Sequence, residues 1–390
     1  YKGRKMWSVS AAWVDYNNDG LLDLFVSNYC QWNPKDAPKC VQNGIRAYCP
    51  PKYFKPLPNT LYRNNGDGTF TDVSAQTGIS EHLGRGMGIG IGDYDGDGYP
   101  DIFVANDNAP NELFHNIGGK RFEEVGEDAM VAYSGEGDVF SGMGVGFGDL
   151  FHTGRPSLWV TATENQTFPL FANLGRGQFA DKTAAAGLAL QTERMSGWSN
   201  AMADFDNDGW KDLVVARSNV LDNIALFIPR TYREPNAIFR NLGNGRFRNV
   251  SATAGPAFQK PAAHRGLAVG DLDNDGKLDM VVSVLNGPAE IFHNTTQNHN
   301  HWIALKLIGT KSNRMGIGAK VKLTGEDGMV QYGYESTSTG YACSSDPRMH
   351  FGLGASKKAK EIDILWPSGT KQVLENVAGD RVVPVTETRR

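Results

Sequence analysis

The sequence has few cysteines, no long apolar run and no excess of one charge. No apolar segment approaches the about 20 residues that cross a bilayer as a helix, so no transmembrane segment is expected. Lys and Arg total 39 against 43 Asp and Glu, which argues against a nucleic-acid-binding protein and against a disordered acidic chain. With 390 residues, 40% of them hydrophobic, the chain can build one large β architecture or two to three domains.

The four cysteines are Cys30, Cys40, Cys49 and Cys343, and no two of them form a C-x-x-C pair. Their spacing argues against zinc ribbons, thioredoxin-like redox sites and c-type haem attachment. An even number of cysteines favours structural disulfides and an oxidising compartment over buried thiols. Three pairings are open, and the sequence does not choose among them.

Signatures of catalysis are also missing. The chain has no G-x-S-x-G elbow, no H-E-x-x-H and no P-loop, and its Gly-rich segment 84–92 is expected to be a strand whose small residues let blades approach one another. Only His293, His299 and His301 lie close together in the sequence, and we interpret them as part of an exposed linker. The sequence therefore predicts a protein that is not an enzyme.

What the chain does contain is an internal repeat. The pattern D-x-[DN]-x-D-G-x-x-D, followed by three apolar residues, begins at Asp15, Asp93, Asp204 and Asp271, and a degenerate copy begins at Asp149. Hairpin signatures with Asn and Gly turns follow the first four copies along the chain. Successive copies lie 78, 56, 55 and 67 residues apart, so one unit has about 55 residues and two units carry insertions.

Each unit is expected to contain four short strands, with the acidic segment joining the first two. Four antiparallel strands per repeat are typical of a β-propeller blade, whereas the rungs of a β-helix are far shorter. The sequence thus predicts an all-β chain with a propeller over residues 1–299. In the second unit the predicted strands are 86–92, 101–105, 112–115 and 121–125.

Residues 29–58 form an insertion within the first unit that carries three of the four cysteines and six prolines. Such a segment cannot be regular structure, and disulfides would hold it in one shape. Two interpretations stay open: a surface loop tied down for stability, and a rigid recognition loop on one face of the propeller.

The acidic segments are predicted to bind calcium. Positions 1, 3, 5 and 9 carry oxygen atoms, position 6 is Gly, and position 7 can offer its carbonyl, which suits a hard cation such as Ca²⁺ and suits Zn²⁺ poorly. Position 12 is Val, not the Glu of an EF-hand, so the loop runs directly into a strand. About four structural Ca²⁺ ions are expected, and none at the Asp149 copy. The predicted ligands are Asp15, Asn17, Asp19, Leu21 and Asp23; Asp93, Asp95, Asp97, Tyr99 and Asp101; Asp204, Asp206, Asp208, Trp210 and Asp212; and Asp271, Asp273, Asp275, Lys277 and Asp279.

These loops resemble the FG-GAP/VCBS repeats of integrin α-subunit propellers. Residues 301–314, 316–321, 340–346, 350–354 and 365–370 resemble an ASPIC/UnbV domain. Repeats and tail together resemble the cartilage acidic protein 1-like family, which implies seven blades and an extracytoplasmic location. Five repeats are visible here, so two N-terminal blades are expected to be missing from the chain, with a five-bladed ring as the alternative. Residues 300–390, with their alternating apolar and polar pattern, are predicted to form a small β-sandwich-like domain packed on the last blade.

The predicted function is a calcium-stabilised propeller that binds a protein or a glycan, or serves as a scaffold. It is expected to be secreted, periplasmic or on the cell surface, alone or as an accessory subunit of a larger envelope or extracellular assembly. The alternative is a propeller enzyme acting on polysaccharide or phosphoester substrates, which would need a funnel of converging Asp, His and Tyr on one face.

The net charge of −4 is shaped by the acidic loops. They hold 15 carboxylates, which leaves 28 acidic against 39 basic residues elsewhere in the chain. Four bound Ca²⁺ ions would shift the total from −4 to +4. The calcium-loaded protein is therefore predicted to be mildly cationic, with anionic glycans or acidic protein surfaces as the first partners to test.

Overall fold

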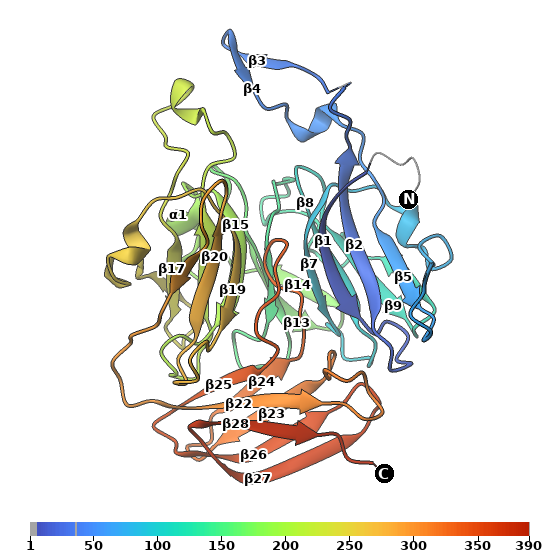
Figure 1. Cartoon of the computed structure of the whole chain (residues 1–390), viewed down its shortest axis with the longest axis vertical. Coiled ribbons are helices and arrows are strands. Elements are labelled where there is room, and N and C mark those ends of the chain that lie inside the picture. The colour runs from blue at the N-terminus through green and yellow to red at the C-terminus, as the bar shows by residue number, and fades with distance from the viewer. Residues whose placement is uncertain (1–5, 36, 390) are drawn as a thin grey trace.

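The computed structural model describes residues 6–35 and 37–389, and almost all of their regular structure is β-strand (Figure 1). Five antiparallel sheets of three or four strands follow one another along the chain up to residue 292, and a two-sheet domain follows them. This confirms the predicted all-β class, with blade-like repeats followed by a small β domain. No helix among the described residues is long and apolar enough to cross a bilayer; the one α-helix is α1 (Ala189–Thr192).

Each sheet of the propeller, here called a blade, begins with the strand that precedes an acidic loop. The first four blades have four strands, and the fifth has three among the described residues. Blade 1 contains β1 (Met6–Val14), β2 (Asp23–Gln31), β5 (Thr60–Asn64) and β6 (Phe70–Asp72). Blade 2 contains β7 (Gly86–Gly92), β8 (Asp101–Asn106), β9 (Glu112–Ile117) and β10 (Arg121–Glu124). Blade 3 contains β11 (Val145–Gly148), β12 (Ser157–Val160), β13 (Leu170–Gly175) and β14 (Gln178–Asp181). Blade 4 contains β15 (Gly197–Ala203), β16 (Asp212–Arg217), β17 (Ala237–Asn241) and β18 (Phe247–Asn249), and blade 5 contains β19 (His264–Gly270), β20 (Asp279–Val284) and β21 (Glu290–Phe292).

The innermost strands of successive blades pack against one another, and glycine makes this close approach possible. A Cβ atom added at Gly92 of β7 would overlap the ring of Phe147 on β11, and one added at Gly90 would lie 2.9 Å from a methyl group of Val145. The Gly-rich segment is thus a buried strand, as the sequence predicts. Large apolar side chains such as Trp159, Phe171 and Phe239 fill the space between the outer strands.

A recurring asparagine links neighbouring blades. It is the fourth residue of the hairpin signature in units 2 to 4 and of the corresponding segment 291–294 in unit 5. Its side-chain amide donates a hydrogen bond to the carbonyl at position 2 of the acidic loop in the preceding unit. The pairs are Asn116 with Tyr16, Asn173 with Tyr94 and Asn294 with Phe205, each at 2.8 Å, and Asn241 with Leu150 at 3.3 Å. The acidic loops and the hairpins, which look like separate motifs in the sequence, therefore form one structural unit.

The insertion at residues 29–58, called the stapled insertion below, contains the hairpin of β3 (Cys40–Gln42) and β4 (Ile45–Ala47). A disulfide joins Cys40 to Cys49, which was one of the pairs that the sequence left open. Cys30 and Cys343 are free thiols, so the expectation that all four cysteines form disulfides is wrong. The hairpin projects from the end of the propeller opposite the C-terminal domain (Figure 1).

The C-terminal domain consists of two sheets packed around a separate apolar core that includes Leu323, Phe351 and Trp366. It lies against the face of the propeller that carries the acidic loops (Figure 1). One sheet has the order β25 (Met349–Gly354), β22 (His301–Ile308), β28 (Arg381–Thr386), with β22 parallel to β28. The other has the order β24 (Val330–Tyr334), β23 (Lys320–Gly325), β26 (Lys358–Leu365), β27 (Lys371–Ala378).

A segment of this domain, residues 336–347, enters the centre of the propeller, and we call it the axial strap. In Figure 1 it rises from the C-terminal domain between the blades. It contacts the innermost strand of every blade through hydrogen bonds of its backbone and of the Ser338 side chain. The contacts are Ala342 with Ser10, Ser338 with Ile89, Gly340 with Val145, Tyr341 with Ser199, and Asp346 with Val269.

Candidate metal centres at the acidic loops

The backbone of the four complete acidic loops turns through left-handed conformations at positions 4 and 6. Only Gly and Asn occupy these positions, because both tolerate a positive φ better than other residues. The turn folds the loop back so that carboxylates from positions far apart converge. The φ angles are 56°, 87°, 57° and 61° at Asn18, Gly96, Asn207 and Asn274, and 87°, 97°, 92° and 86° at Gly20, Gly98, Gly209 and Gly276.

The carboxylates at positions 1 and 9 are fixed by backbone amides. Position 1 accepts a hydrogen bond from the amide of position 6 in every complete loop, and position 9 accepts one from the amide of the hairpin asparagine. The first set pairs Asp15 with Gly20 (3.0 Å), Asp93 with Gly98 (2.8 Å), Asp204 with Gly209 (2.8 Å) and Asp271 with Gly276 (3.0 Å). The second pairs Asp23 with Asn64, Asp101 with Asn116, Asp212 with Asn241 and Asp279 with Asn294, all at 2.8 Å.

Three loops bring three carboxylates together so closely that one oxygen from each lies within 4.8 Å of the others. Within the described part of the chain, the first loop forms no such trio, and its position 3 is the amide side chain of Asn17. The trios are Asp93, Asp95 and Asp101; Asp204, Asp206 and Asp212; and Asp271, Asp273 and Asp275.

Burial shifts the pKa of these carboxyl groups upward. Loss of solvent is the largest cause, and neighbouring loop carboxylates add to it. It raises the pKa of Asp15 to about 6, that of Asp23 and Asp101 to about 7, and that of Asp204 to about 8. A divalent cation among these oxygens would favour their ionised form.

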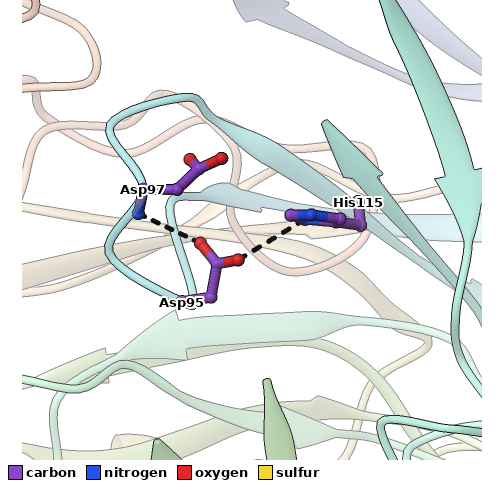
Figure 2. A group of neighbouring side chains, drawn as sticks. All are labelled: Asp95, Asp97 and His115. Carbon is purple, nitrogen blue, oxygen red and sulfur yellow. Dashed lines mark hydrogen bonds and ion pairs between the residues drawn. The ribbon is translucent and has the colours of Figure 1, made fainter. Parts of the chain in front are cut away.

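Histidine joins two of the clusters, and the pattern of the acidic loops does not predict this. His115 Nδ1 lies 3.1 Å from Asp101 and 3.6 Å from Asp95, and it forms a second trio with Asp95 and Asp97. Figure 2 shows Asp95 between the backbone amide of Asp97 and the ring of His115. The hydrogen bond with Asp101 raises the pKa of His115.

In units 2, 4 and 5, the third residue of the hairpin segment faces the acidic loop of the same unit. His293 Nδ1 lies 3.2 Å from Asp279, so this histidine faces its own loop and is not part of a cluster with His299 and His301. In the fourth unit the same position is Arg240, whose guanidinium pairs with Asp206 at 2.8 Å and with Asp208 at 3.1 Å. The change of residue type at this one position is the sequence feature that could have predicted which side chains join the acidic loops.

The donor set fits a hard cation. The side chains at positions 1, 3, 5 and 9 would hold Ca²⁺ with oxygen atoms, and the ion would neutralise the gathered charge. Position 7 lies beside this set, because its amide donates to the carboxylate of position 5. These bonds pair Leu21 with Asp19, Tyr99 with Asp97 and Lys277 with Asp275 at 2.8 Å, and Trp210 with Asp208 at 2.9 Å.

The degenerate copy keeps the turn but lacks the ligands. Asp149 accepts a hydrogen bond from the amide of Gly154 at 2.7 Å, as position 1 does in the complete loops. Phe151, Thr153 and Ser157 occupy positions 3, 5 and 9, and the Ser157 hydroxyl is buried without a hydrogen-bond partner among the described residues. The absence of a metal at this copy stays a prediction.

The C-terminal domain covers the acidic loops. The imidazole of His350 lies 2.7 Å from Asn207 Oδ1, and the amide of Gly354 donates to the Asn207 carbonyl at 2.9 Å. Arg348 donates to the side chain of Asn274 and to the carbonyl of Asp271, both at 2.6 Å. The ammonium of Lys320 pairs with Asp93. Residues of the predicted metal sites therefore form part of the domain interface.

Two known domain families match parts of this chain. The FG-GAP-like repeat matches residues 55–104, 93–160 and 221–282, and the ASPIC and UnbV domain matches residues 309–390. The first covers parts of the propeller, and the second covers most of the C-terminal domain.

Similar proteins match over nearly the whole chain. Cartilage acidic protein 1 of Homo sapiens is 26% identical over 384 residues, which are 97% of this chain and 53% of that protein. Cartilage acidic protein 1 of Xenopus tropicalis is 27% identical over 384 residues, 94% of this chain and 53% of that protein. The chain thus spans about half the length of these relatives. Among solved structures, the BP39L lectin from Burkholderia pseudomallei is 11% identical, with a TM-score of 0.37 over 96% of this chain and 98% of that one, a likeness too low to bear on ligand or function.

Proposed function

We propose that this member of the cartilage acidic protein 1-like family is a calcium-stabilised binding or scaffold module that acts outside the cytoplasm. The chain joins FG-GAP-like repeats to an ASPIC and UnbV domain. The observation that carries the proposal is the convergence of carboxylates in three acidic loops, at 4.8 Å or less. The disulfide between Cys40 and Cys49 supports an oxidising location.

A binding role is favoured over catalysis because the centre of the propeller is already occupied. The axial strap contacts the innermost strand of each blade, so the place where a propeller enzyme would hold its substrate funnel is filled by the chain itself. A polysaccharide or phosphoester substrate would have to displace this segment.

One cavity of about 160 Å³ between the strap and the acidic-loop face contains groups with shifted pKa values. Burial lowers the pKa of Lys211, lowers that of His350 to about 4 and raises that of Glu335. Its volume lies below the roughly 300 Å³ at which small-molecule sites begin. Bound water, which would satisfy the unpaired Oε1 of Glu335 and Nδ1 of His350, suits the cavity better than a substrate does.

Calcium titration of thermal stability tests the proposal. If each site binds with a dissociation constant near 0.1 mM, about 1 mM Ca²⁺ adds roughly 1.4 kcal/mol per site and about 5 to 6 kcal/mol for four sites. We expect the melting temperature to rise on adding Ca²⁺ and to fall in EDTA. An identical melting curve in both conditions would contradict the proposal.

Two substitutions at aspartates separate metal binding from general destabilisation. Asp101→Asn removes a ligand at position 9, so it should reduce the calcium-dependent rise in melting temperature by about a quarter if the four sites contribute equally. Asp149→Asn alters the degenerate loop and serves as the matched control. It should lower stability in both buffers and leave the calcium-dependent rise unchanged.

A further inference from the structure

We infer that the stapled insertion is a docking surface for an anionic glycan, an inference that rests on the binding function proposed above. Residues 29–58 contain five basic residues and one acidic residue, whereas the whole chain has a net charge of −4. The rest of the chain is therefore at −8, and the four expected Ca²⁺ ions would bring it to about 0, so the net positive charge of the calcium-loaded protein lies on one projecting element. This concentration of positive charge favours an anionic partner at this end of the molecule.

The basic side chains of the insertion are available to a ligand. Lys35, Lys39, Arg46, Lys52 and Lys55 are all exposed. Among the residues that the structure describes, none of the five forms an ion pair with a carboxylate. Lys52 Nζ lies 5.7 Å from the centre of the Tyr53 ring, a cation–π contact. Cations that are not paired with a carboxylate can meet sulfate or carboxylate groups without first breaking an ion pair.

Exposed aromatic rings accompany these cations. Trp32 is 40% exposed, Tyr48 61% and Tyr53 58%, and Trp7 of β1 is 48% exposed. The ring centroids of Trp7 and Trp32 are 5.7 Å apart. The backbone of Lys55 lies next to that of Gln31, the chain neighbour of Trp32, because its carbonyl accepts a hydrogen bond from the Gln31 amide at 2.9 Å. An exposed flat ring next to a cation can stack on the apolar face of a sugar ring while the cation meets its acidic substituent.

The framework of the insertion is held in place at several points. The disulfide closes the hairpin, and the six prolines restrict the chain on both sides of it. The hairpin also contacts blade 4: Asn223 donates to the carbonyl of Arg46 at 2.8 Å, and the hydroxyl of Tyr48 lies 3.4 Å from Asp222. A surface fixed in this way loses little conformational entropy when a ligand binds.

The arrangement fits a glycan better than an acidic protein surface. A stable protein interface buries about 800 Å² per partner around a central apolar cluster. Here the exposed rings are one close pair, Trp7 and Trp32, and two tyrosines, Tyr48 and Tyr53. The insertion also carries five exposed cations, Lys35, Lys39, Arg46, Lys52 and Lys55. A few rings and many cations on a small projecting element match a chain of sugar rings that carries charged substituents.

Calorimetry with defined oligosaccharides tests the inference, using the full chain in 1 mM Ca²⁺. The probes are a sulfated heparin-derived hexasaccharide, a hyaluronan hexasaccharide and uncharged maltohexaose. We expect binding of the two anionic probes and none of maltohexaose. The triple variant Lys39→Ser, Arg46→Ser, Lys52→Ser should bind the sulfated probe about tenfold more weakly. Trp32→Ala should also weaken binding, and its effect should persist at about 0.5 M salt, where the effect of the charge variant is screened.

The triple variant Lys357→Ser, Lys360→Ser, Lys371→Ser is the matched control, because it removes the same charge from exposed positions of the C-terminal domain. It should change the affinity less than twofold. Equal losses in both triple variants would overturn the inference, since binding would then follow net charge alone. Equally tight binding of a poly-glutamate peptide, unaffected by Trp32→Ala, would overturn it in favour of an acidic protein. Absence of binding with an intact calcium-dependent rise in melting temperature would overturn this inference and leave the proposed calcium-stabilised module standing.

Discussion

Glu387, just after β28, links the end of the C-terminal domain to residues 310–312, which follow β22, and to Ser368. Its carboxylate accepts hydrogen bonds from the amides of Thr310 and Lys311 at 2.8 Å and of Ser312 at 2.9 Å, and from the hydroxyls of Ser312 and Ser368. Burial acts to raise its pKa, but the bond from Ser368 and the three amides outweigh burial and lower the pKa to about 2. The charged form is thus the one that the fold stabilises.

Replacing Glu387→Gln should therefore destabilise the C-terminal domain in a pH-dependent way. The folded-state pKa lies below the ordinary value of 4.5, so the stabilisation is complete above about pH 5 and is lost as the pH falls toward 2. We expect a loss of about 2 kcal/mol in the free energy of unfolding at pH 7, shrinking at pH 3, measured by urea denaturation. Glu375→Gln, on the exposed part of β27, is the control and should cost less than about 0.5 kcal/mol. A loss for Glu387→Gln that is the same at both pH values would contradict this assignment.

The acidic loop of blade 2 contains both residues that the sequence pattern predicts and one neighbour that it does not. The spacing of Asp93, Asp95 and Asp101 predicts that these carboxylates face one another, because a loop of fixed length with Gly at position 6 has few ways to turn. His115 belongs to a different motif, 14 residues beyond Asp101, and reaches the cluster only through the pairing of β8 with β9. Such a contact depends on register between strands, which the loop pattern does not contain.

At the scale of elements, the acidic loops serve both the blades and the docking of the C-terminal domain. Gly276 and Gly98 occupy position 6 of their loops with similar positive φ angles, 86° and 97°. Their surroundings differ: a Cβ at Gly276 would overlap the indole of Trp302, whereas a Cβ at Gly98 would have no atom within 4 Å. The pair therefore separates the cost of the backbone conformation from the cost of the interface.

Gly98→Ala should lower the free energy of unfolding by about 1 kcal/mol, since only the left-handed backbone is penalised. Gly276→Ala should cost about 3 kcal/mol or more, because the added methyl group must also displace Trp302. Limited proteolysis at the 293–300 linker should accelerate in the second variant alone. Equal costs in the two variants would show that Trp302 moves aside freely.

The strands and the loops could be predicted because both repeat along the chain; β7 spans the predicted residues 86–92, and β8 begins at the predicted Asp101. The axial strap could not be predicted. Residues 336–347 have no repeat and no alternating pattern, and their hydrogen bonds join positions up to 332 residues apart, as between Ala342 and Ser10. The free state of Cys343 follows from the same placement, because this thiol lies against Gly266 of β19.

For the whole molecule, the strap and the acidic loops together determine how the C-terminal domain sits on the propeller. The strap is anchored at its centre by the mutual hydrogen bonds of Gly340 and Val145, at 2.8 and 3.1 Å. At its base, Arg348 holds Asn274 and the Asp271 carbonyl, both in an acidic loop. If calcium fixes these loops, it also fixes the surface to which the domain is attached. Among the described residues of the C-terminal domain, Lys320 is the cation that would share its carboxylate, Asp93, with a metal ion.

Removing calcium should therefore loosen the docking of the C-terminal domain before the domain itself unfolds. In hydrogen–deuterium exchange, a peptide that covers the strap should exchange at least about tenfold faster in EDTA than in Ca²⁺, because its amides are protected by the propeller. A peptide that covers β23 is the internal control, since its amides are paired with β24 and β26 inside the domain. Equal acceleration of both peptides would mean that the two parts unfold as one unit. An unchanged exchange rate of the strap peptide would mean that the docking is independent of the metal. The hydrogen bonds of Gly340, Tyr341 and Ala342 to the inner strands would then hold the domain in place without ordered acidic loops.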